Sequence, residues 1–411
     1  MAVKKLKVLF FGEGATLAHV ARPLMLAEGL DANQFEVVLC RPPGYASLTT
    51  DLPFPVLDLA CQDASIFADH LEHGRPLYDF ATLSRYVETD LGLIDQEAPD
   101  IIVGDFRLSL AVSARLRSTP YITICDAYWS PERALSPRLP VFGFTRFIPI
   151  PLMDFLFRQI SPMAFKLHAR PIERLRAKFG LPSLGHDLRC CYTDADLRLF
   201  ANFPALFPEI RPHLGADFLG PISWSPPPSA EQTALNNDER PLVYVTMGSS
   251  GSARVTEAII PVLEKKGVRI IVSTAGKPLK IAPKKSSTQV FSFFPGAVAC
   301  KQADLIICNG GSPTTNQALI NGKPVLGICQ NMDQLLNMEA IESYGAGIQL
   351  RSDRTNQSRI DAALSSLFGD PKYSFQARQL ANTLPKQTFH EILGQHLVRL
   401  YGRSTASLAQ P

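Results

Sequence analysis

The chain has 411 residues, of which 46% are hydrophobic and 19% charged, a composition typical of two or three folded domains with hydrophobic cores. Its 41 Lys and Arg residues against 38 Asp and Glu residues give a net charge of +3, too small to indicate nucleic-acid binding. No apolar run reaches the roughly 18 residues of a membrane-spanning helix, and Val8–Phe11 is too short for the apolar core of a signal peptide.

Eight cysteines are spread along the chain without a CxxC pair. Most of them lie inside apolar runs, where a thiol usually behaves as a small buried hydrophobic group. The pattern predicts neither a zinc site nor a disulfide framework, and we expect a reducing, cytoplasmic environment.

Short apolar runs alternate with helix-like stretches in the first half of the chain. The runs that predict buried strands are Lys7–Phe11, Phe35–Leu39, Asp100–Val103 and Tyr121–Ile124. Leu17–Leu30 and Leu108–Leu116 predict helices between strands. Continuous apolar runs joined by helices are typical of parallel, doubly wound α/β sheets.

The segment Pro140–Phe165 departs from this pattern because it is rich in Phe, Ile, Leu and Met and is interrupted by prolines. The prolines argue against a single membrane-spanning helix. One interpretation is a loop and helix that pack into the core. The other is an apolar wall for a lipophilic ligand, or a surface that touches a membrane.

Ser223–Arg240 has the composition of a linker, since it contains three consecutive prolines and then polar residues. The alternation of strands and helices resumes after it. Predicted strands are Leu242–Thr246, Arg269–Ser273, Thr288–Phe293, Leu305–Cys308 and Pro324–Ile328, and predicted helices are Val255–Lys265, Pro313–Asn321 and Leu335–Tyr344. The chain therefore reads as two α/β units.

Ligands of doubly wound sheets bind beyond the carboxyl ends of the strands, so the loops there are the candidate sites. The first loop begins with Gly12 and Gly14, which resembles a dinucleotide fingerprint. However, Leu17 occupies the third glycine position, and the second strand ends in Cys40-Arg41 without an acidic residue for a ribose. These two departures argue against a nicotinamide or flavin site.

His19 follows the first loop, and Asp105 follows the strand that begins at Asp100. A lone His is often structural and a lone Asp often caps a helix. If the two strand ends meet, however, the carboxylate fixes the tautomer of the imidazole and raises the basicity of its other nitrogen. His19 and Asp105 are therefore a candidate general-base dyad.

Two loops of the second half suit an anionic ligand. Met247–Ser252 is rich in Gly and Ser, and Asn309–Thr315 places two glycines and hydroxyl residues before a helix that begins near Pro313. The N-terminus of such a helix offers free N–H groups and a positive dipole end to a diphosphate. Asp333 and Gln334 follow the next strand and suit the hydroxyls of a sugar.

The stretch Asn309–Gly347 resembles the donor-site signature of the family 1 (UDP-glycosyltransferase-like) glycosyltransferases of GT-B fold. The matching residues are Gly310-Gly311, Thr314-Thr315, Gly322-Lys323-Pro324, Asp333-Gln334, Asn337 and Gly345-Ala346-Gly347. Further similar stretches, which extend the resemblance over nearly the whole chain, are Gly12–Leu30, Pro99–Asp105, Ile172–Leu181, Leu199–Pro221, Met247–Ser250 and Phe293–Pro295.

The resemblance implies two Rossmann-like domains that face each other across a cleft. They are an acceptor-binding domain at 1–224 and a donor-binding domain at 239–385, joined by a linker at 225–238. A last helix within 386–411 is implied to cross back to the first domain.

The implied reaction is an inverting, metal-independent transfer of a hexose from a nucleotide sugar, with UDP favoured over dTDP, to a hydroxyl of a small lipophilic acceptor. His19 takes the proton of that hydroxyl and Asp105 steadies the imidazolium. The implied donor-binding residues are Gly14, Gly248, Ser249, Phe294, Asn309, Gly310, Gly311, Ser312, Thr314, Thr315, Gln317, Asp333 and Gln334. No cofactor is implied beyond the nucleotide sugar, and Asp194-Ala195-Asp196 is interpreted as surface charge rather than a metal site.

Three residues depart from the family pattern. Asn309 stands where the family has His, Gln317 where it has Glu, and Gly296 where it has Gln. A catalytically weak or inactive nucleotide-sugar binding protein therefore remains an alternative, as does an epimerase or hydrolytic enzyme of the same fold. Contact with a membrane surface remains open, and no nucleic-acid partner is expected.

Overall fold

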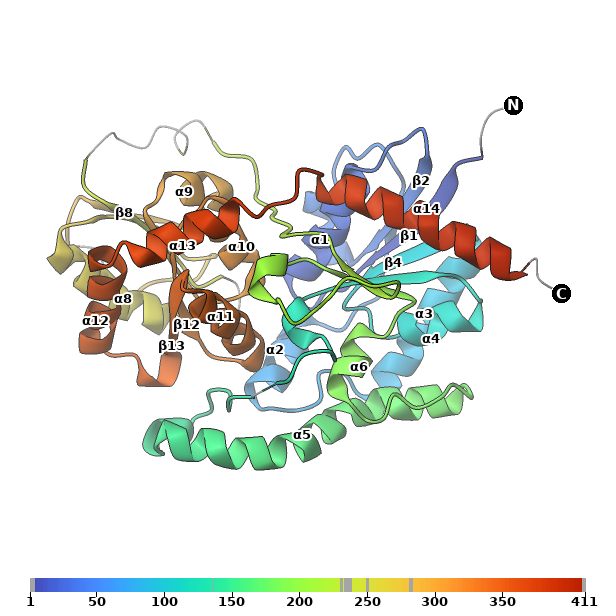
Figure 1. Ribbon diagram of the computed structural model, residues 1–411, viewed down its shortest axis with the longest axis horizontal. Helices are drawn as coiled ribbons and strands as arrows, with labels where there is room; N and C mark the ends of the chain where they lie inside the picture. Colours follow the sequence, from blue (N-terminus) through green and yellow to red (C-terminus); the bar gives the residue numbers. More distant parts are fainter. Residues whose placement is uncertain are drawn as a thin grey trace.

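The computed structural model describes residues 4–135, 137–229, 232, 239–248, 251–280 and 284–408 of the chain. Two parallel sheets lie side by side, each covered by helices on both faces (Figure 1). The seven-stranded sheet consists of β1 (Leu6–Gly12), β2 (Phe35–Arg41), β3 (Val56–Asp58), β4 (Ile101–Asp105), β5 (Tyr121–Cys125), β6 (Leu197–Phe200) and β7 (Ala216–Phe218). The six-stranded sheet consists of β8 (Leu242–Thr246), β9 (Arg269–Ser273), β10 (Thr288–Phe291), β11 (Leu305–Cys308), β12 (Val325–Cys329) and β13 (Gly347–Arg351).

The two sheets have the same type of strand order. The first runs β3-β2-β1-β4-β5-β6-β7 and the second runs β10-β9-β8-β11-β12-β13. Both are doubly wound, with the order reversing between β1 and β4 in the first and between β8 and β11 in the second. The predicted fold of two Rossmann-like units is therefore confirmed. The four candidate loops follow the four strands at the two points of reversal.

The predicted strands are all present, with ends that differ by one or two residues. The sequence analysis missed β3, β6, β7 and β13, which lie at or near the sheet edges. Two of them have only three residues, and such short runs carry little periodic signal.

Helices cover both sheets. Those of the first half are α1 (Leu17–Glu28), α2 (Ala64–Glu72), α3 (Phe80–Glu97), α4 (Leu110–Leu116), α5 (Ile150–Lys178) and α6 (Leu188–Thr193). Those of the second half are α8 (Ala253–Lys266), α9 (Gly296–Gln302), α10 (Ser312–Ile320), α11 (Met332–Tyr344), α12 (Gln357–Gly369), α13 (Lys372–Ala381) and α14 (Phe389–Leu408). The short 3-10 turns are η1 (Pro43–Leu48), η2 (Ala127–Trp129), η3 (Thr145–Phe147), η4 (Pro204–Leu206) and η5 (Ser352–Arg354).

The last helix, α14, lies along the first sheet although the chain before it belongs to the second (Figure 1). Leu393 and Leu397 are buried in the apolar cluster that contains Val8 and Leu24. His390 Nε2 lies 2.8 Å from the carbonyl oxygen of Met25. Apolar burial and this polar contact thus attach the chain end to α1. The predicted domain boundaries stay a prediction, and most of the predicted linker lies outside the described residues.

Helix α5 runs without a break from Ile150 to Lys178, through Pro162. Proline has no N–H for the carbonyl of Arg158, and the hydroxyl of Ser161 donates to that carbonyl instead, at 3.2 Å. Most large apolar side chains between 144 and 167 are exposed, so the interpretation of this segment as core packing is wrong for them. No helix of the described ranges is both long and apolar enough to cross a membrane.

The two domains are joined directly as well as through the linker. One buried apolar cluster contains Phe200 and Phe207 from the first domain together with Leu335 and Ile341 from the second. Polar contacts add to it, because Arg351, Asp353 and Arg354 bind the segment around Thr145. The two domains are therefore in direct apolar and polar contact.

A buried ionic cluster lies beside the first loop. The fully buried Arg107 contacts Glu13 and Asp90, each at 3.0 Å, and its guanidinium lies 3.5 Å from the ring centre of Tyr86. Ser109 donates to the other oxygen of Asp90 at 2.5 Å. Burial raises the pKa of Asp90 above its ordinary value, while Arg107 and the hydroxyl act in the opposite direction. One guanidinium thus compensates two buried carboxylates.

We expect Arg107→Leu to lower the free energy of unfolding by about 3–5 kcal/mol, because it leaves two buried carboxylates without a cation. The exposed pair Arg117–Asp95 provides the matched control, and Arg117→Leu should leave the free energy of unfolding nearly unchanged, because solvent screens this pair. Urea-induced unfolding followed by far-UV circular dichroism measures both variants. Equal losses in the two variants would contradict the role given to the buried cluster.

Candidate active site

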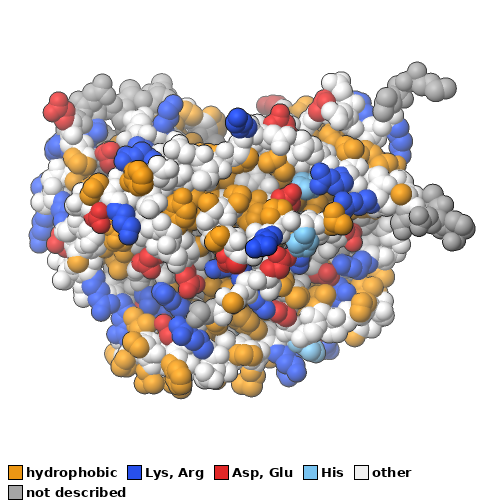
Figure 2. Space-filling model, in the orientation of Figure 1, with side chains coloured by type: hydrophobic (Ala, Val, Ile, Leu, Met, Phe, Trp, Pro, Cys, Tyr) orange, Lys and Arg blue, Asp and Glu red, His pale blue; other side chains and the backbone are white. Residues whose placement is uncertain are grey.

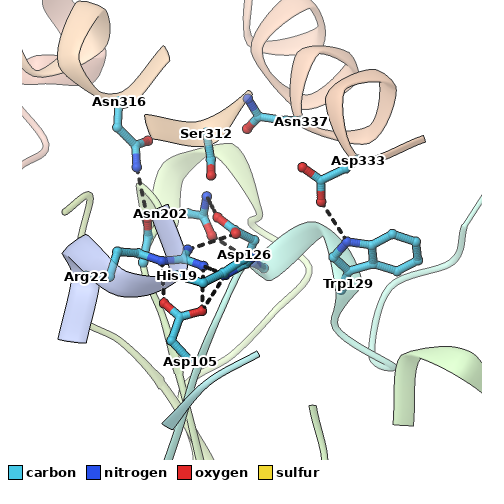
Figure 3. Close-up of polar contacts among 12 residues, drawn as sticks. His19, Arg22, Asp105, Asp126, Trp129, Asn202, Ser312, Asn316, Asp333 and Asn337 are labelled. Carbon is cyan, nitrogen blue, oxygen red and sulfur yellow. Dashed lines mark hydrogen bonds and ion pairs between the residues drawn. The ribbon is translucent and has the colours of Figure 1, made fainter. Parts of the chain in front are cut away.

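His19 and Asp105 meet at the point where the order of the first sheet reverses. Gly12 pairs with Asp105 in the register of β1 and β4, and His19 lies in the first turn of α1. The Nδ1 atom of His19 lies 2.7 Å from Oδ1 of Asp105 (Figure 3). Nδ1 is therefore engaged with the carboxylate, while Nε2 is the nitrogen available for another partner.

Arg22 and Asp126 extend this pair into a network that the sequence analysis missed. Arg22 binds both oxygens of Asp105, through Nε at 2.6 Å and Nη2 at 2.9 Å, and its Nη1 donates to Asp126 at 2.8 Å. Asn202 donates to the other oxygen of Asp126 at 3.1 Å. Burial acts to raise the pKa of Asp105, but Arg22 and His19 hold it below its ordinary value. Asp105 is therefore a charged carboxylate at neutral pH.

Both missed residues carried a signal. Arg22 lies three residues after His19, and residues at this spacing share one face of a helix. Asp126 follows β5 directly, so it ends a strand as Asp105 does. Applying the rule on strand ends to every strand of the first sheet would have found Asp126.

An aromatic cluster lies on one side of His19. Phe106 has a left-handed backbone with φ of 56°, an uncommon conformation for a residue with a side chain, and its ring stacks on His19 at 4.8 Å. Tyr192 contacts Phe106 edge-on at 5.2 Å and Trp129 at 5.3 Å. Phe67 contacts Phe106 from the other side at 6.1 Å. The imidazole thus lies against an aromatic wall.

Asn309, Gly310 and Gly311 form the turn between β11 and α10. Gly310 has a φ of 83°, and a Cβ atom there would lie 2.7 Å from Met338 and 2.8 Å from Cys329. Only glycine fits this position. Asn309 is buried, and its Oδ1 accepts from the Gly311 N–H at 3.1 Å. Gly311 caps α10 on its N-terminal side.

The hydroxyl residues of this helix start differ in what they contact. Thr315 is fully buried, donates to the carbonyl oxygens of Gly311 and Ser312 and accepts from Asn337 at 2.9 Å. Its hydroxyl therefore serves the helix start itself. Ser312 is buried, whereas Thr314 is partly exposed.

Asp333 and Gln334 begin α11, across from the first domain. Trp129 donates through its indole nitrogen to Oδ1 of Asp333 at 3.0 Å (Figure 3). Burial and the negative charge of Asp126 raise the pKa of Asp333 above its ordinary value. Gln334 is buried in a capping box with Asn331, where Oε1 accepts from the backbone of Gln330 at 2.8 Å. Of the two predicted sugar contacts, Asp333 thus binds a residue of the first domain, whereas Gln334 is used within the start of its own helix.

Gln317 and Gly296 fill one space. The amide of Gln317 donates to the carbonyl oxygen of Trp224 at 2.6 Å, and a Cβ atom on Gly296 would lie 2.1 Å from Oε1 of Gln317. Phe294 is buried in the core of the second domain, where it contacts Phe291 at 4.9 Å. Two departures from the family pattern therefore fit one another.

Three predicted donor residues remain. Gly14 is buried against Pro42, to which a Cβ atom would approach within 2.9 Å. Gly248 has a φ of 59°, and its missing Cβ would lie 3.6 Å from the amide nitrogen of Asn309. The two loops of the second sheet thus meet. Ser249 lies outside the described residues.

Asp196 is exposed, as the interpretation as surface charge expects, whereas Asp194 is partly buried and paired with two arginines. Asp194 follows α6 and binds Arg115 at 2.8 Å and Arg176 at 2.6 Å. Asp196 accepts from the N–H of Tyr121 at 2.8 Å. Within the described ranges, no three or more His, Cys, Asp or Glu residues are grouped so that they could hold a metal ion.

Comparison with known proteins gives relatives over almost the whole chain. A PGL/p-HBAD biosynthesis glycosyltransferase of Mycobacterium tuberculosis is 40% identical over 381 residues, which cover 92% of this chain and 88% of the relative. A PGL/p-HBAD biosynthesis rhamnosyltransferase of Mycobacterium bovis is 39% identical over 385 residues, which cover 93% of this chain and 85% of that relative.

A family model and solved structures agree with these relatives. Residues 269–399 match the family described as erythromycin biosynthesis protein CIII-like, C-terminal domain. The structure of a spinosyn rhamnosyltransferase complexed with thymidine diphosphate is similar with a TM-score of 0.69, at 16% identity, over 96% of this chain and 100% of its own. Together with the two doubly wound domains, these likenesses show that the chain belongs to the UDP-glycosyltransferase-like family of GT-B glycosyltransferases.

Proposed function

We propose that the protein transfers a hexose from a nucleoside diphosphate sugar to a hydroxyl of a lipophilic acceptor, with inversion at the anomeric carbon. The observation that carries the proposal is the contact between His19 and the charged Asp105, beside the interdomain contact of Trp129 with Asp333 (Figure 3). A base and a sugar-binding carboxylate then come from the two facing domains.

In the proposed reaction, Nε2 of His19 takes the proton of the acceptor hydroxyl. The hydroxyl oxygen forms the new bond to the anomeric carbon as the bond from that carbon to the diphosphate oxygen breaks. The imidazolium is stabilised by Asp105, to which Nδ1–H donates, and Arg22 fixes the carboxylate by binding both of its oxygens. The proton thus ends on His19, and the electron pair of the broken bond ends on the diphosphate oxygen.

The diphosphate leaving group gains negative charge as the bond breaks. We assign its stabilisation to the positive end of the helix dipole at the start of α10, with the backbone N–H of Ser312, since the N–H of Gly311 already donates to Asn309. We assign a hydrogen bond to the diphosphate to the hydroxyl of Thr314, because the hydroxyl of Thr315 is used within the helix. The mechanism proposed here uses no metal ion and no cofactor other than the donor.

We assign the sugar hydroxyls to the carboxylate of Asp333, which Trp129 orients. Gln334 would reach the sugar only through its amide nitrogen, because its oxygen is used in the capping box. The aromatic wall of Phe106, Tyr192 and Trp129 supports an acceptor with a large apolar part.

Two nucleotides are candidates for the donor. The resemblance of the sequence favours UDP, whereas the rhamnosyltransferase relative, together with the thymidine diphosphate in a structurally similar rhamnosyltransferase, favours dTDP. A thermal-shift screen with UDP, dTDP, GDP and their sugars decides between them. We expect one nucleotide class to raise the melting temperature, because a ligand that binds only the folded state stabilises it by mass action. No shift with any of them would support the inactive alternative.

We expect His19→Ala to lower kcat by about a hundredfold to ten-thousandfold, since it removes the general base. The melting-temperature rise with the donor should be unchanged, because His19 contacts the acceptor side. His213→Ala, at an exposed His paired with Glu132, is the matched control and should leave kcat unchanged. Unchanged turnover of the His19 variant would contradict the proposed base, and consumption of donor at full rate without acceptor would indicate a hydrolytic enzyme.

The raised pKa of Asp333 makes a prediction about pH. As the pH falls, Asp333 takes up a proton earlier than an ordinary aspartate, and a neutral carboxyl accepts hydrogen bonds from sugar hydroxyls less strongly. The affinity for the nucleotide sugar should therefore fall in mild acid, and Asp333→Asn should remove this dependence. Calorimetric titration of the nucleotide sugar measures it, with the Asp333→Asn variant as the control. The same pH dependence in the wild type and the variant would contradict the role of Asp333.

A further inference from the structure

We propose that the outward face of η3 and α5 is a docking surface for a membrane with anionic lipids. The surface lies along one edge of the molecule, beneath both domains (Figure 1). The proposal rests on the proposed function in one respect, that the acceptor is lipophilic and is reached from this surface.

The apolar part of this surface is one side of a helix. Large apolar side chains that are 46–74% exposed are Phe144, Phe147, Leu152, Phe155, Leu156, Ile160, Met163 and Leu167. Those of α5 recur every three to four residues, so they share one side of the helix. Figure 2 shows apolar side chains gathered with basic ones along the corresponding edge of the molecule. An exposed apolar area of this size marks a binding surface.

The charged part of the surface is basic. The row of exposed apolar residues continues along the same side of α5 as Arg170, Arg174 and Lys178, and Arg158 and Lys166 flank it. The two acidic residues of α5 are turned to the protein instead. Asp154 accepts from the N–H of Leu139, and the buried Glu173 accepts from the backbone of Leu184. The exposed charge of the helix is therefore positive throughout.

The opposite side of α5 is firmly attached. Ala169, Ile172 and Leu175 are buried in the same apolar cluster as Phe67, and Met153 and Phe157 are buried nearer the start of the helix. With 29 residues the helix is roughly 43 Å long. The exposed side is thus presented by a fixed helix, and amphipathic helices of this composition lie in the interface of anionic membranes.

The surface is connected with the candidate active site. The cluster that holds Ala169 and Ile172 also includes Phe106 and Tyr192, the rings beside His19. The inner side of the proposed docking helix thus packs on the same cluster as the aromatic wall beside the candidate base.

A membrane fits this surface better than a second copy of the chain. Two copies that paired through α5 would offer no exposed acidic residue of this helix to the basic row of the other copy, so its charges would stay uncompensated. An anionic lipid surface takes up both the apolar and the basic part, and each basic residue adds to the attraction. The described helices include none that could cross the bilayer, so the contact is made at its surface.

The test is co-sedimentation of the full chain with phosphatidylcholine vesicles, with and without phosphatidylglycerol. We expect binding to the anionic vesicles, weaker binding to the neutral ones, and partial release by salt, which screens the charges but not the apolar contact. Wild-type protein that is folded, by circular dichroism, and stays in the supernatant with anionic vesicles would overturn the proposal.

Two double variants test the two parts of the surface. Phe155→Ser with Met163→Ser and Lys166→Glu with Arg170→Glu should each weaken vesicle binding by about tenfold or more. The matched controls are Leu214→Ser with Phe375→Ser, and Lys265→Glu with Lys301→Glu, at exposed positions elsewhere. Equal binding of test and control variants would overturn the proposal. A second outcome would also overturn it. The wild type would self-associate in sedimentation velocity without binding vesicles, and the α5 variants would abolish this self-association.

Activity assays separate this proposal from the proposed function. The α5 variants should keep their turnover of a water-soluble acceptor and lose it with an acceptor embedded in vesicles. Vesicle binding without any transfer of sugar would leave the docking surface in place and refute the proposed function. Transfer to the embedded acceptor at the wild-type rate by the α5 variants would refute the docking surface alone.

Discussion

Asp105 ends a fully buried strand, and its carboxylate stays charged there because Arg22 and His19 surround it. Burial by itself disfavours a charged carboxylate, so the charge depends on these two partners. Both come from α1, which packs on β1 and β4. The position of one helix on one sheet therefore sets the geometry of the candidate base, the charge of its carboxylate partner and the ring nitrogen that stays clear of that partner.

The candidate site also depends on the contact between the two domains, which face each other on the sides where the order of their strands reverses. Trp129 of the first domain binds Asp333 of the second, and Asn316 at the start of α10 donates to the carbonyl oxygen of Ala201 (Figure 3). A shared apolar cluster extends this contact. The candidate donor and acceptor sides are thus parts of one interface, and a change in the angle between the domains would alter both at once.

The departures from the family pattern have a physical account when they are considered together. Gln317 occupies space that any side chain at Gly296 would need, and its amide is bound by the backbone at Trp224. Asn309 lacks the charge of a His, yet it organises the turn whose N–H groups begin α10. Read singly, these residues suggest a lost donor site. In the structure they are accommodated by their neighbours, since Gln317 fills the space beside Gly296 and Asn309 holds the turn before α10.

The sequence alone determined the two doubly wound units and the four candidate loops, because buried parallel strands read as apolar runs and ligands bind after their carboxyl ends. It also indicated His19, Asp105 and Asp333, through their places after predicted strands and then through the resemblance. Only the tertiary structure decided which groups share a site. Arg22, Asp126 and Trp129 acquire their roles from contacts between residues up to 204 positions apart, which no local pattern encodes. The same holds for α5, since periodicity finds an apolar side of a helix but not whether the protein covers it.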